Sequence, residues 1–190
     1  MKTILFPTLK LFVALTLFTG VIYPLAMTGV ASALYPRAAG GSLIKDSAGN
    51  PRASTWVGQE FSKPGEFWGR LSQTAEAPYN GMAAGGSNLG TSNPGLAENA
   101  SPRLQALATS AKVPVDLVTS SGSGLDPHIS PEAALAQVER ISRATGQPPH
   151  VLQALVVRAT EPRTFGVLGQ PRVNVVKLNL SLKDLLKETL

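Results

Sequence analysis

The run LFVALTLFTGVIYPLAMTGVASALY, residues 11–35, decides how this chain is organised. It holds 25 residues without one charged or histidine side chain. A helix of that length spans about 37 Å, which is enough to cross a hydrocarbon core of about 30 Å with some tilt. Gly20, Pro24 and Gly29 would weaken a soluble helix, but a membrane helix tolerates them. We therefore predict a single transmembrane helix over residues 11–35.

A cleaved signal peptide is the alternative for the same run. Lys2 and Lys10 form a positively charged start, and Ala31-Ser32-Ala33 is a small-residue pattern typical of a cleavage site. The apolar run is far longer than the roughly 7–15 residues of a signal-peptide core, which favours a retained anchor. Both interpretations place residues 36–190 outside the cytoplasm, because the basic stub of residues 1–10 prefers the cytoplasmic side.

The composition excludes several classes of protein. Charged residues make up 15% of the 190 residues, against about 25% in an ordinary globular protein, and the deficit lies mainly in the apolar run. The chain contains no cysteine, which excludes disulfides, thiolate metal sites and cysteine nucleophiles. The net charge of +5 is scattered rather than clustered, so we expect no nucleic-acid binding. The part after the apolar run is long enough for one domain and too short for two.

That domain is expected to open with a short hairpin. Residues 42–45 and 54–57 flank the turn-rich segment DSAGNP, residues 46–51, a pattern typical of two short strands. Residues 59–95 show no regular periodicity, which predicts a long loop. The aromatic residues in this segment predict that their side chains hold the loop against a core.

The rest of the domain predicts three helices, a strand and an amphipathic C-terminal segment. Ser101 and Ser130 are expected to cap the first two helices, each with a proline at the first helical position, and the third begins at Pro148-Pro149. Gly146 is expected past the end of the second helix. Residues 172–180 (RVNVVKLNL) alternate like a strand. The side chains expected to face inward are Leu104, Leu107, Ala108, Val138, Ile141, Leu152, Leu155 and Val156.

The predicted fold class is therefore α+β. A single N-terminal transmembrane helix is followed by one small extracytoplasmic domain with a short sheet and about three to four helices.

No constellation of residues predicts catalysis or metal binding by the chain itself. His128 and His150 lie far apart in the sequence and do not fill a coordination sphere. Ser121 or Ser123, with His128 and Asp126, supplies the residue types of a hydrolase, but the sequence around both serines is typical of a polar turn rather than of a nucleophile elbow. The glycine-rich residues 85–95 lack the Lys or Arg that a nucleotide phosphate needs.

A series of short motifs in a fixed order is more informative. It comprises GVIYPL (residues 20–25), GSLI (41–44), VGQEF (57–61), FWGRLS (67–72), GGSNLG (85–90), VPVDLVT (113–119), GSGLDPHIS (122–130) and GQPRVNV (169–175). This series resembles the C subunit of the Kdp-type potassium-transporting ATPase, the KdpC family, and it covers essentially the whole chain. One departure is Leu71, where the family usually has proline.

The resemblance implies a non-catalytic accessory subunit of a high-affinity, ATP-driven potassium uptake complex in the bacterial inner membrane. The implied partners are a channel-like potassium-binding subunit, a P-type ATPase subunit and a small single-helix subunit. The family is commonly described as a catalytic chaperone that raises the affinity of the pump for ATP. An extracytoplasmic domain cannot touch cytoplasmic ATP, so we expect a role in assembly, no cofactor bound independently, and ATP bound only by the catalytic partner.

Partner contacts are predicted in two places, the small-residue face of the apolar helix and the aromatic loop. The small residues facing lipid are the alternative for the first, and core packing is the alternative for the second. The residues concerned are Gly20, Tyr23, Pro24, Gly29, Trp56, Phe61, Phe67, Trp68 and Tyr79.

Two other classes of function stay open. A membrane-anchored binding domain would be stable without partner subunits, and a secreted hydrolase would lose its activity on Ser123→Ala. Neither class accounts for the ordered motifs.

Overall fold

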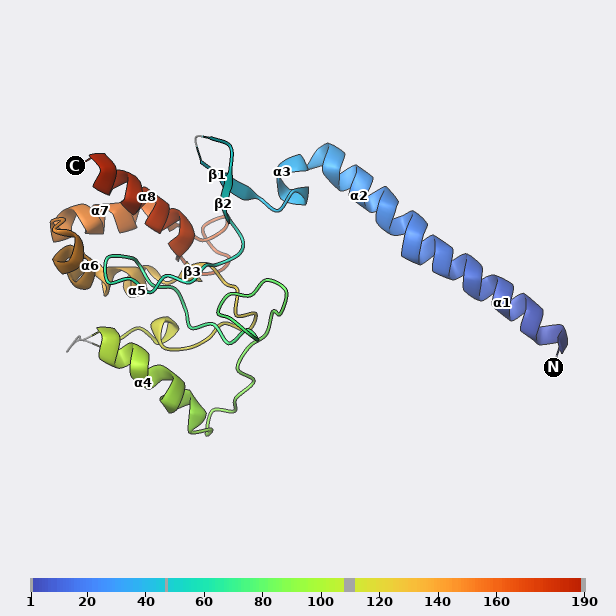
Figure 1. Cartoon of the computed structure of the whole chain (residues 1–190), viewed down its shortest axis with the longest axis horizontal. Coiled ribbons are helices and arrows are strands. Elements are labelled where there is room, and N and C mark those ends of the chain that lie inside the picture. Colours follow the sequence, from blue (N-terminus) through green and yellow to red (C-terminus); the bar gives the residue numbers. More distant parts are fainter. Residues whose placement is uncertain (1, 47, 108–111, 189–190) are drawn as a thin grey trace. The chain divides into compact units, whose positions relative to one another are not determined.

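The computed structural model describes residues 2–46, 48–107 and 112–188 of the chain (Figure 1). The chain forms two compact units, Met1–Pro51 and Arg52–Leu190. The N-terminal unit is almost entirely helical, whereas the C-terminal unit combines short helices with a small sheet.

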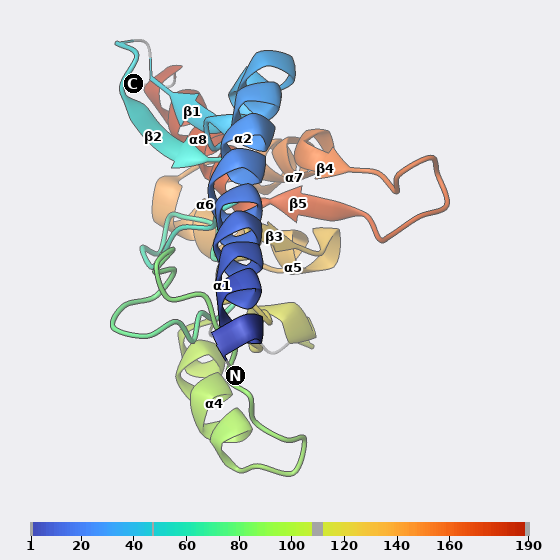
Figure 2. The same cartoon turned by 90° about the vertical axis from the view of Figure 1, so that its right-hand side faces the viewer.

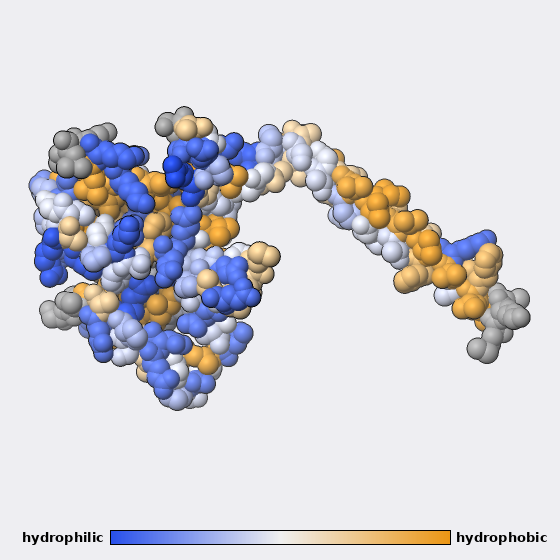
Figure 3. Space-filling model, viewed as in Figure 1, coloured by the Kyte–Doolittle hydropathy of each residue, from blue (hydrophilic) through white to orange (hydrophobic). Residues whose placement is uncertain are grey.

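One long helical stretch makes up most of the N-terminal unit (Figure 1). It consists of α1 (Lys2–Leu17), the π-helix η1 (Phe18–Ile22) and α2 (Tyr23–Leu34), and the short α3 (Pro36–Ala39) follows. The part from Ile4 to Leu34, with a mean hydropathy of 1.9, is long and apolar enough to cross a membrane, and Figure 3 shows hydrophobic side chains along much of its visible face. The predicted apolar helix is thus confirmed, although it begins at Lys2 rather than at residue 11.

The π-helical turn ends at Ile22, two residues before Pro24, which has no N–H to donate. The N–H of Tyr23 donates to the carbonyl of Phe18, five residues back, and such a bulge is one of the few ways in which a helix accommodates an interior proline. Three threonine hydroxyls also donate to carbonyls four residues back, at 2.8 or 2.9 Å, and these are Thr8, Thr19 and Thr28. The hydroxyls are therefore satisfied within the helix, as a lipid environment requires.

The predicted hairpin is confirmed. β1 (Leu43–Lys45) and β2 (Pro51–Ser54) form a two-stranded sheet, and the boundary between the two units passes through β2. Asp46 closes the turn, because its N–H donates to the Asn50 carbonyl and its carboxylate accepts the Asn50 N–H, both at 2.9 Å. The second strand begins at Pro51 rather than at Ser54.

The C-terminal unit is α+β, as predicted. Its sheet has the order β3-β5-β4, with both pairings antiparallel. Helices α5, α7 and α8 pack against the central strand β5. The remaining elements of the unit are α4 (Gly95–Leu107), η2 (Val115–Leu117), β3 (His128–Ile129), α5 (Pro131–Leu135), α6 (Val138–Thr145), α7 (Pro149–Ala159), β4 (Thr160–Glu161), β5 (Arg172–Asn174) and α8 (Val175–Glu188).

Two of the predicted helix starts are confirmed. The hydroxyl of Ser130 accepts the Ala133 N–H at 3.1 Å and so caps α5, and α7 begins at Pro149. Gly146 ends α6 in the left-handed conformation, with φ +74°. The second predicted helix is divided, because α5 ends at Leu135 and α6 begins at Val138. The predicted inward residues of these helices are buried, namely Val138, Ile141, Leu152, Leu155 and Val156.

The predicted start of the first helix at Ser101 is wrong. α4 begins at Gly95, whose N–H donates to the Asn93 side chain at 2.9 Å, so Asn93 rather than Ser101 supplies the first side-chain acceptor. Pro102 therefore lies inside the helix. Of the predicted inward side chains, Leu107 is buried and Leu104 is exposed, whereas Ala108 lies outside the described residues.

The predicted strand over residues 172–180 is also wrong beyond its first residues. β5 ends at Asn174, and α8 begins at Val175. The side-chain oxygen of Asn174 accepts the Lys177 N–H at 3.1 Å, which is the geometry of a helix N-cap. Val175, Leu178 and Leu182 are buried at the spacing of one helix face. The apolar pattern of this segment is therefore compatible with a helix as well as with a strand.

Candidate functional site

The long loop after β2 is held to the core by the backbone of Phe67 and Trp68. Asn179 on α8 accepts the Phe67 N–H and donates to the Phe67 carbonyl, both at 2.8 Å. Gln137, which precedes α6, accepts the Trp68 N–H at 2.8 Å and donates to the Trp68 carbonyl at 3.1 Å. Both amide side chains are fully buried. These two side chains, the amide clamp, give the loop the hydrogen bonds that a neighbouring strand would otherwise provide.

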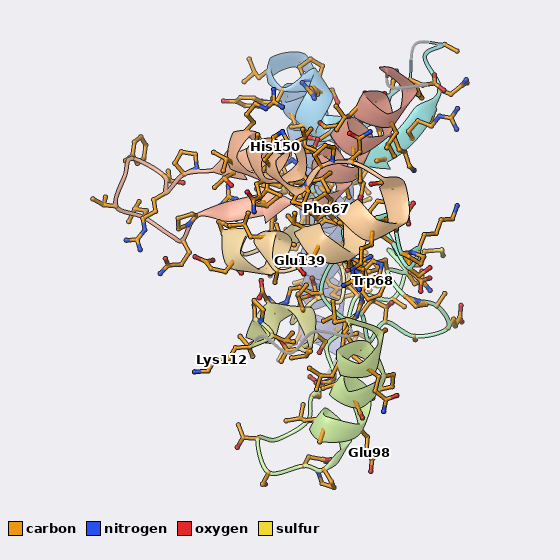
Figure 4. All side chains as sticks on the ribbon, turned by 90° about the vertical axis from the view of Figure 1, so that its left-hand side faces the viewer. Phe67, Trp68, Glu98, Lys112, Glu139 and His150 are labelled. Carbon is orange, nitrogen blue, oxygen red and sulfur yellow. The ribbon has the colours of Figure 1, made fainter. Side chains whose placement is uncertain are left out.

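The ring of Trp68 lies against two arginines. The guanidinium of Arg140 is 3.8 Å from the ring centroid, and that of Arg103 is 4.8 Å from it. Arg140 also donates to the Gln137 side chain at 2.7 Å and to the Glu66 carbonyl at 2.9 Å. Burial lowers the pKa of Arg140 to about 10, so this arginine stays charged at neutral pH. Figure 4 shows Phe67 and Trp68 among the side chains at the centre of the unit.

A pocket of about 330 Å³ opens between the Trp68 side chain and α4. Trp68, Arg103 and Tyr79 line it together with Glu60. The Tyr79 hydroxyl donates to the Arg70 carbonyl at 2.7 Å, and burial raises the pKa of Tyr79 to about 12. Burial also lowers the pKa of Arg103. The wall of this pocket thus combines aromatic rings with both positively and negatively charged side chains.

Arg70 links the long aromatic loop, residues 59–95, to a second segment of the unit, residues 119–130. Its guanidinium donates to the Ser120 carbonyl at 3.0 Å and lies 3.9 Å from the Asp126 carboxylate. The N–H of Leu71 donates to the Thr119 carbonyl at 3.3 Å, which adds a further hydrogen bond between these two parts of the chain.

Asp126, His128 and Asn174 form a chain of polar contacts at the start of β3. The Asp126 carboxylate accepts the His128 N–H at 3.0 Å and lies 3.1 Å from His128 Nδ1. Nε2 of His128 is 3.5 Å from the Asn174 amide, which donates to the Thr55 carbonyl at 2.9 Å. Burial alone would raise the pKa of Asp126, but the hydrogen bonds from His128 outweigh it and leave this pKa lowered.

This chain of contacts lacks the serine of a hydrolase. The Ser123 hydroxyl accepts the Leu125 N–H at 3.1 Å, as the predicted polar turn requires. In the described segment 112–188, no hydrogen bond joins Ser123 to His128. Nε2 of His128 faces the Asn174 side-chain amide instead. The nucleophile–base contact that activates a serine is therefore missing here. Among the described residues, no group of three or more His, Asp or Glu side chains is placed to hold a metal ion.

Two motif glycines of the loop make room for Tyr79, and this packing role of Tyr79 was not predicted from the sequence. A Cβ atom at Gly69 would lie 2.7 Å from the Tyr79 hydroxyl, and one at Gly58 would overlap the Tyr79 ring. Gly124 has φ +67°, and a Cβ there would lie 2.7 Å from the Gly85 carbonyl. Gly58 and Gly69, from two different motifs, therefore leave room for the same Tyr79 side chain, whereas Gly124 allows the close approach of the Gly85 backbone.

The predicted contact residues of the loop divide into two groups. Phe67 and Trp68 are buried in the core, so core packing accounts for both. Phe61 packs against that core and Tyr79 is half-buried. Trp56 is 62% exposed and lines a groove with Arg70, Asp126, His128 and Arg172. Contact with a partner stays a prediction, and Trp56 has the largest exposed fraction of the five side chains.

The predicted contact residues of the helix lie on its exposed surface. These are Gly20 in η1 and Tyr23, Pro24 and Gly29 in α2. A Cβ atom at Gly20 or at Gly29 would meet nothing within 4 Å. Their contact with a partner helix also stays a prediction.

The architecture, one exposed apolar helix followed by one α+β unit, fits a single-pass membrane protein. Residues 5–184 match the family described as "K+-transporting ATPase, c chain", KdpC. The chain is 53% identical over 190 residues to the "Potassium-transporting ATPase KdpC subunit" of Polaromonas naphthalenivorans, covering 97% of this chain and 96% of the relative. It is 52% identical over 182 residues to the protein of the same name from Ralstonia nicotianae, covering 93% and 89%. The chain therefore belongs to the KdpC family, and the resemblance of its motifs is confirmed.

Proposed function

We propose that this chain is the accessory subunit that assembles and stabilises an ATP-driven potassium uptake complex. The observation that carries the proposal is the family match, which spans both the apolar helix and the α+β unit and so concerns the whole architecture. The relatives are named as subunits of a potassium-transporting ATPase. The partners we propose are a channel-like potassium-binding subunit, a P-type ATPase subunit and a small single-helix subunit.

The polar groups of the C-terminal unit support an accessory rather than a catalytic role. Arg70, Asp126 and Arg140 each hold backbone or side-chain groups of the same unit. The amide clamp is fully used in fixing the loop. Side chains that are held by such contacts support the fold of the unit rather than form a catalytic centre. The aspartyl-phosphate chemistry belongs to the ATPase partner.

We also propose that the chain binds no ATP by itself. With the C-terminal unit outside the inner membrane, any effect on the affinity of the pump for ATP passes through the conformational equilibrium of the complex. Such couplings are ordinarily about 1–3 kcal/mol. Calorimetric titration of the purified full chain with MgATP is expected to give no binding heat, and binding in the micromolar range would overturn this part of the proposal.

The assembly role is tested by expressing the other subunits with and without this chain. We expect the intact complex, purified through a tag on the ATPase subunit and resolved by native electrophoresis, to be lost when the chain is omitted. An unchanged yield of intact, transporting complex without the chain would contradict the proposal. Ser123→Ala in the same complex is expected to leave transport unchanged, which separates this role from that of a hydrolase.

A further inference from the structure

The hairpin between β4 and β5 carries apolar side chains away from the core. Its tip, residues 164–168, contains Phe165, Val167 and Leu168, which are 90%, 73% and 59% exposed. Figure 2 shows the hairpin reaching outward beyond the ends of β4 and β5. Single exposed apolar residues are ordinary on a protein surface, but a contiguous cluster at a projecting tip marks an interaction site.

Hydrogen bonds and an ion pair join the two sides of the hairpin from its tip to its base. Thr164 and Leu168 exchange two backbone hydrogen bonds, at 2.9 and 3.0 Å. Below them, Arg163 donates to the Gln170 side chain at 2.8 Å. At the base, the paired residues Glu161 and Arg172 form an ion pair at 3.1 Å. Three successive cross-strand ties therefore fix the direction in which the tip points.

The backbone at the tip also favours a specific role for Phe165. Its φ is +54°, in the left-handed region, and Gly166 follows with φ +77°. A bulky residue with positive φ is a steric outlier, whereas asparagine or glycine adopts this conformation with little strain. The chain thus holds a large aromatic ring in full exposure at a position where a small residue would fit the turn better. Strain of this kind is typical of functional sites.

We infer that the hairpin tip inserts Phe165 into an apolar pocket on another subunit of the same membrane complex. The inference rests on the proposed function, because it takes its partner from the complex. A ring whose direction is already fixed loses little further conformational entropy when it binds. Such preorganisation favours binding to a protein pocket of matching shape. An aromatic anchor filling a pocket is also the usual form of an interface hot spot.

Two other occupants fit the hairpin tip less well. A lipid surface is fluid, so binding to it does not require a side chain with a fixed direction. Segments that bind anionic lipid also carry clusters of Lys or Arg. The one basic residue next to the tip, Arg163, instead donates a hydrogen bond to the Gln170 side chain. A second copy of the chain would bury on the order of 400 Å² per partner through these three side chains, about half of what a stable interface needs. A small anchor is sufficient inside a complex whose subunits also meet at other surfaces.

The test uses the complete complex purified through a tag on this chain. A photo-crosslinking amino acid replaces Phe165, and a matched control replaces Val115, an apolar residue that is 70% exposed elsewhere on the same unit. We expect light to join position 165 to a partner subunit, identified by mass spectrometry, and to leave position 115 without that product. Crosslinking to lipid alone, to a second copy, at both positions equally or at neither would overturn the inference.

A second variant separates binding from folding. Phe165→Asn removes the ring and also relieves the left-handed strain, so the thermal unfolding of the full chain is expected not to shift downward. The dissociation of the partner subunits from the tagged complex is expected to accelerate by about tenfold or more. Unchanged dissociation would overturn the inference alone. Failure of the natural chain to co-purify with any partner subunit would instead overturn the proposed function, and the inference with it.

Discussion

Single polar residues decide where the loops of this protein run. The amide clamp of Gln137 and Asn179 satisfies both backbone groups of Phe67 and of Trp68. Neither amide stands out in the sequence, because a glutamine before an amphipathic helix and an asparagine on a helix usually face solvent. Their role depends on contacts across more than sixty residues of chain, at separations of 69 and 112 positions. No local pattern encodes such contacts.

The amide clamp gives the first prediction. Gln137→Ala leaves the buried N–H and carbonyl of Trp68 without partners and opens a cavity, so it is expected to lower the free energy of unfolding by about 2–4 kcal/mol. Urea unfolding of the full chain, followed by tryptophan fluorescence, measures the change. Glu139→Ala, at an exposed neighbouring position, is the control and is expected to stay within about 0.5 kcal/mol. Equal effects of the two variants would contradict the clamp.

Asp126 gives a prediction about pH. Because its pKa is lowered in the folded protein, the ionised carboxylate stabilises the fold above the ordinary aspartate pKa, and this contribution is lost as the pH falls through the lowered value. Asp126→Asn is therefore expected to destabilise the chain at pH 7. The difference from the natural chain should shrink below about pH 4. Urea unfolding at pH 7, 5 and 3 tests this, and a difference that grows toward acid would contradict it.

At the scale of elements, local capping signals were the predictable part. Ser130 followed by proline, Gly146 after a helix and Pro149 at a helix start act through neighbouring backbone groups, so their effect can be read from the sequence. Residues 172–180 could not be assigned in this way. Their apolar residues suit both a strand and a helix, and Asn174 resolves the choice because its side chain caps α8.

The cap at Asn174 is testable. Asn174→Val is compatible with a strand but removes the cap and the hydrogen bond to Thr55, so we expect a loss of about 2–3 kcal/mol in the free energy of unfolding. Asn174→Ser retains a capping oxygen and is expected to lose about half as much. Chemical unfolding followed by circular dichroism compares the two. Equal losses would show that the cap is unimportant for α8.

The apolar helix gives a prediction about assembly. Gly20→Leu meets no atom of the chain itself within 4 Å of the new Cβ and raises the helix propensity at that position. If a partner helix packs on the small-residue face, the added bulk is expected to lower the amount of partner subunits that co-purify with the chain. Ala14→Leu adds a similar bulk in α1 and serves as the control. An unchanged yield of complex for Gly20→Leu would favour the alternative that this face meets lipid.

At the scale of the whole molecule, the sequence was most informative about organisation and family. The charge-free run predicted the apolar helix, and the ordered motifs predicted the KdpC family, because both signals extend over many residues. The hairpin tip was not foreseen. Its exposed cluster depends on the pairing of β4 with β5, and the GQPRVNV motif alone gives no sign of which residues project. Sequence patterns record which residues a family shares, whereas exposure is a property of the folded chain.

The central claim is that the C-terminal unit lies outside the inner membrane as part of the uptake complex. The chain contains no cysteine, so Ser181→Cys, at an exposed position on α8, introduces a unique thiol. Intact cells that express the whole complex are treated with a membrane-impermeant maleimide, with the natural cysteine-free chain as the blank. We predict labelling of the variant in intact cells. Protection in intact cells, followed by labelling after permeabilisation, would place the unit in the cytoplasm and contradict the claim.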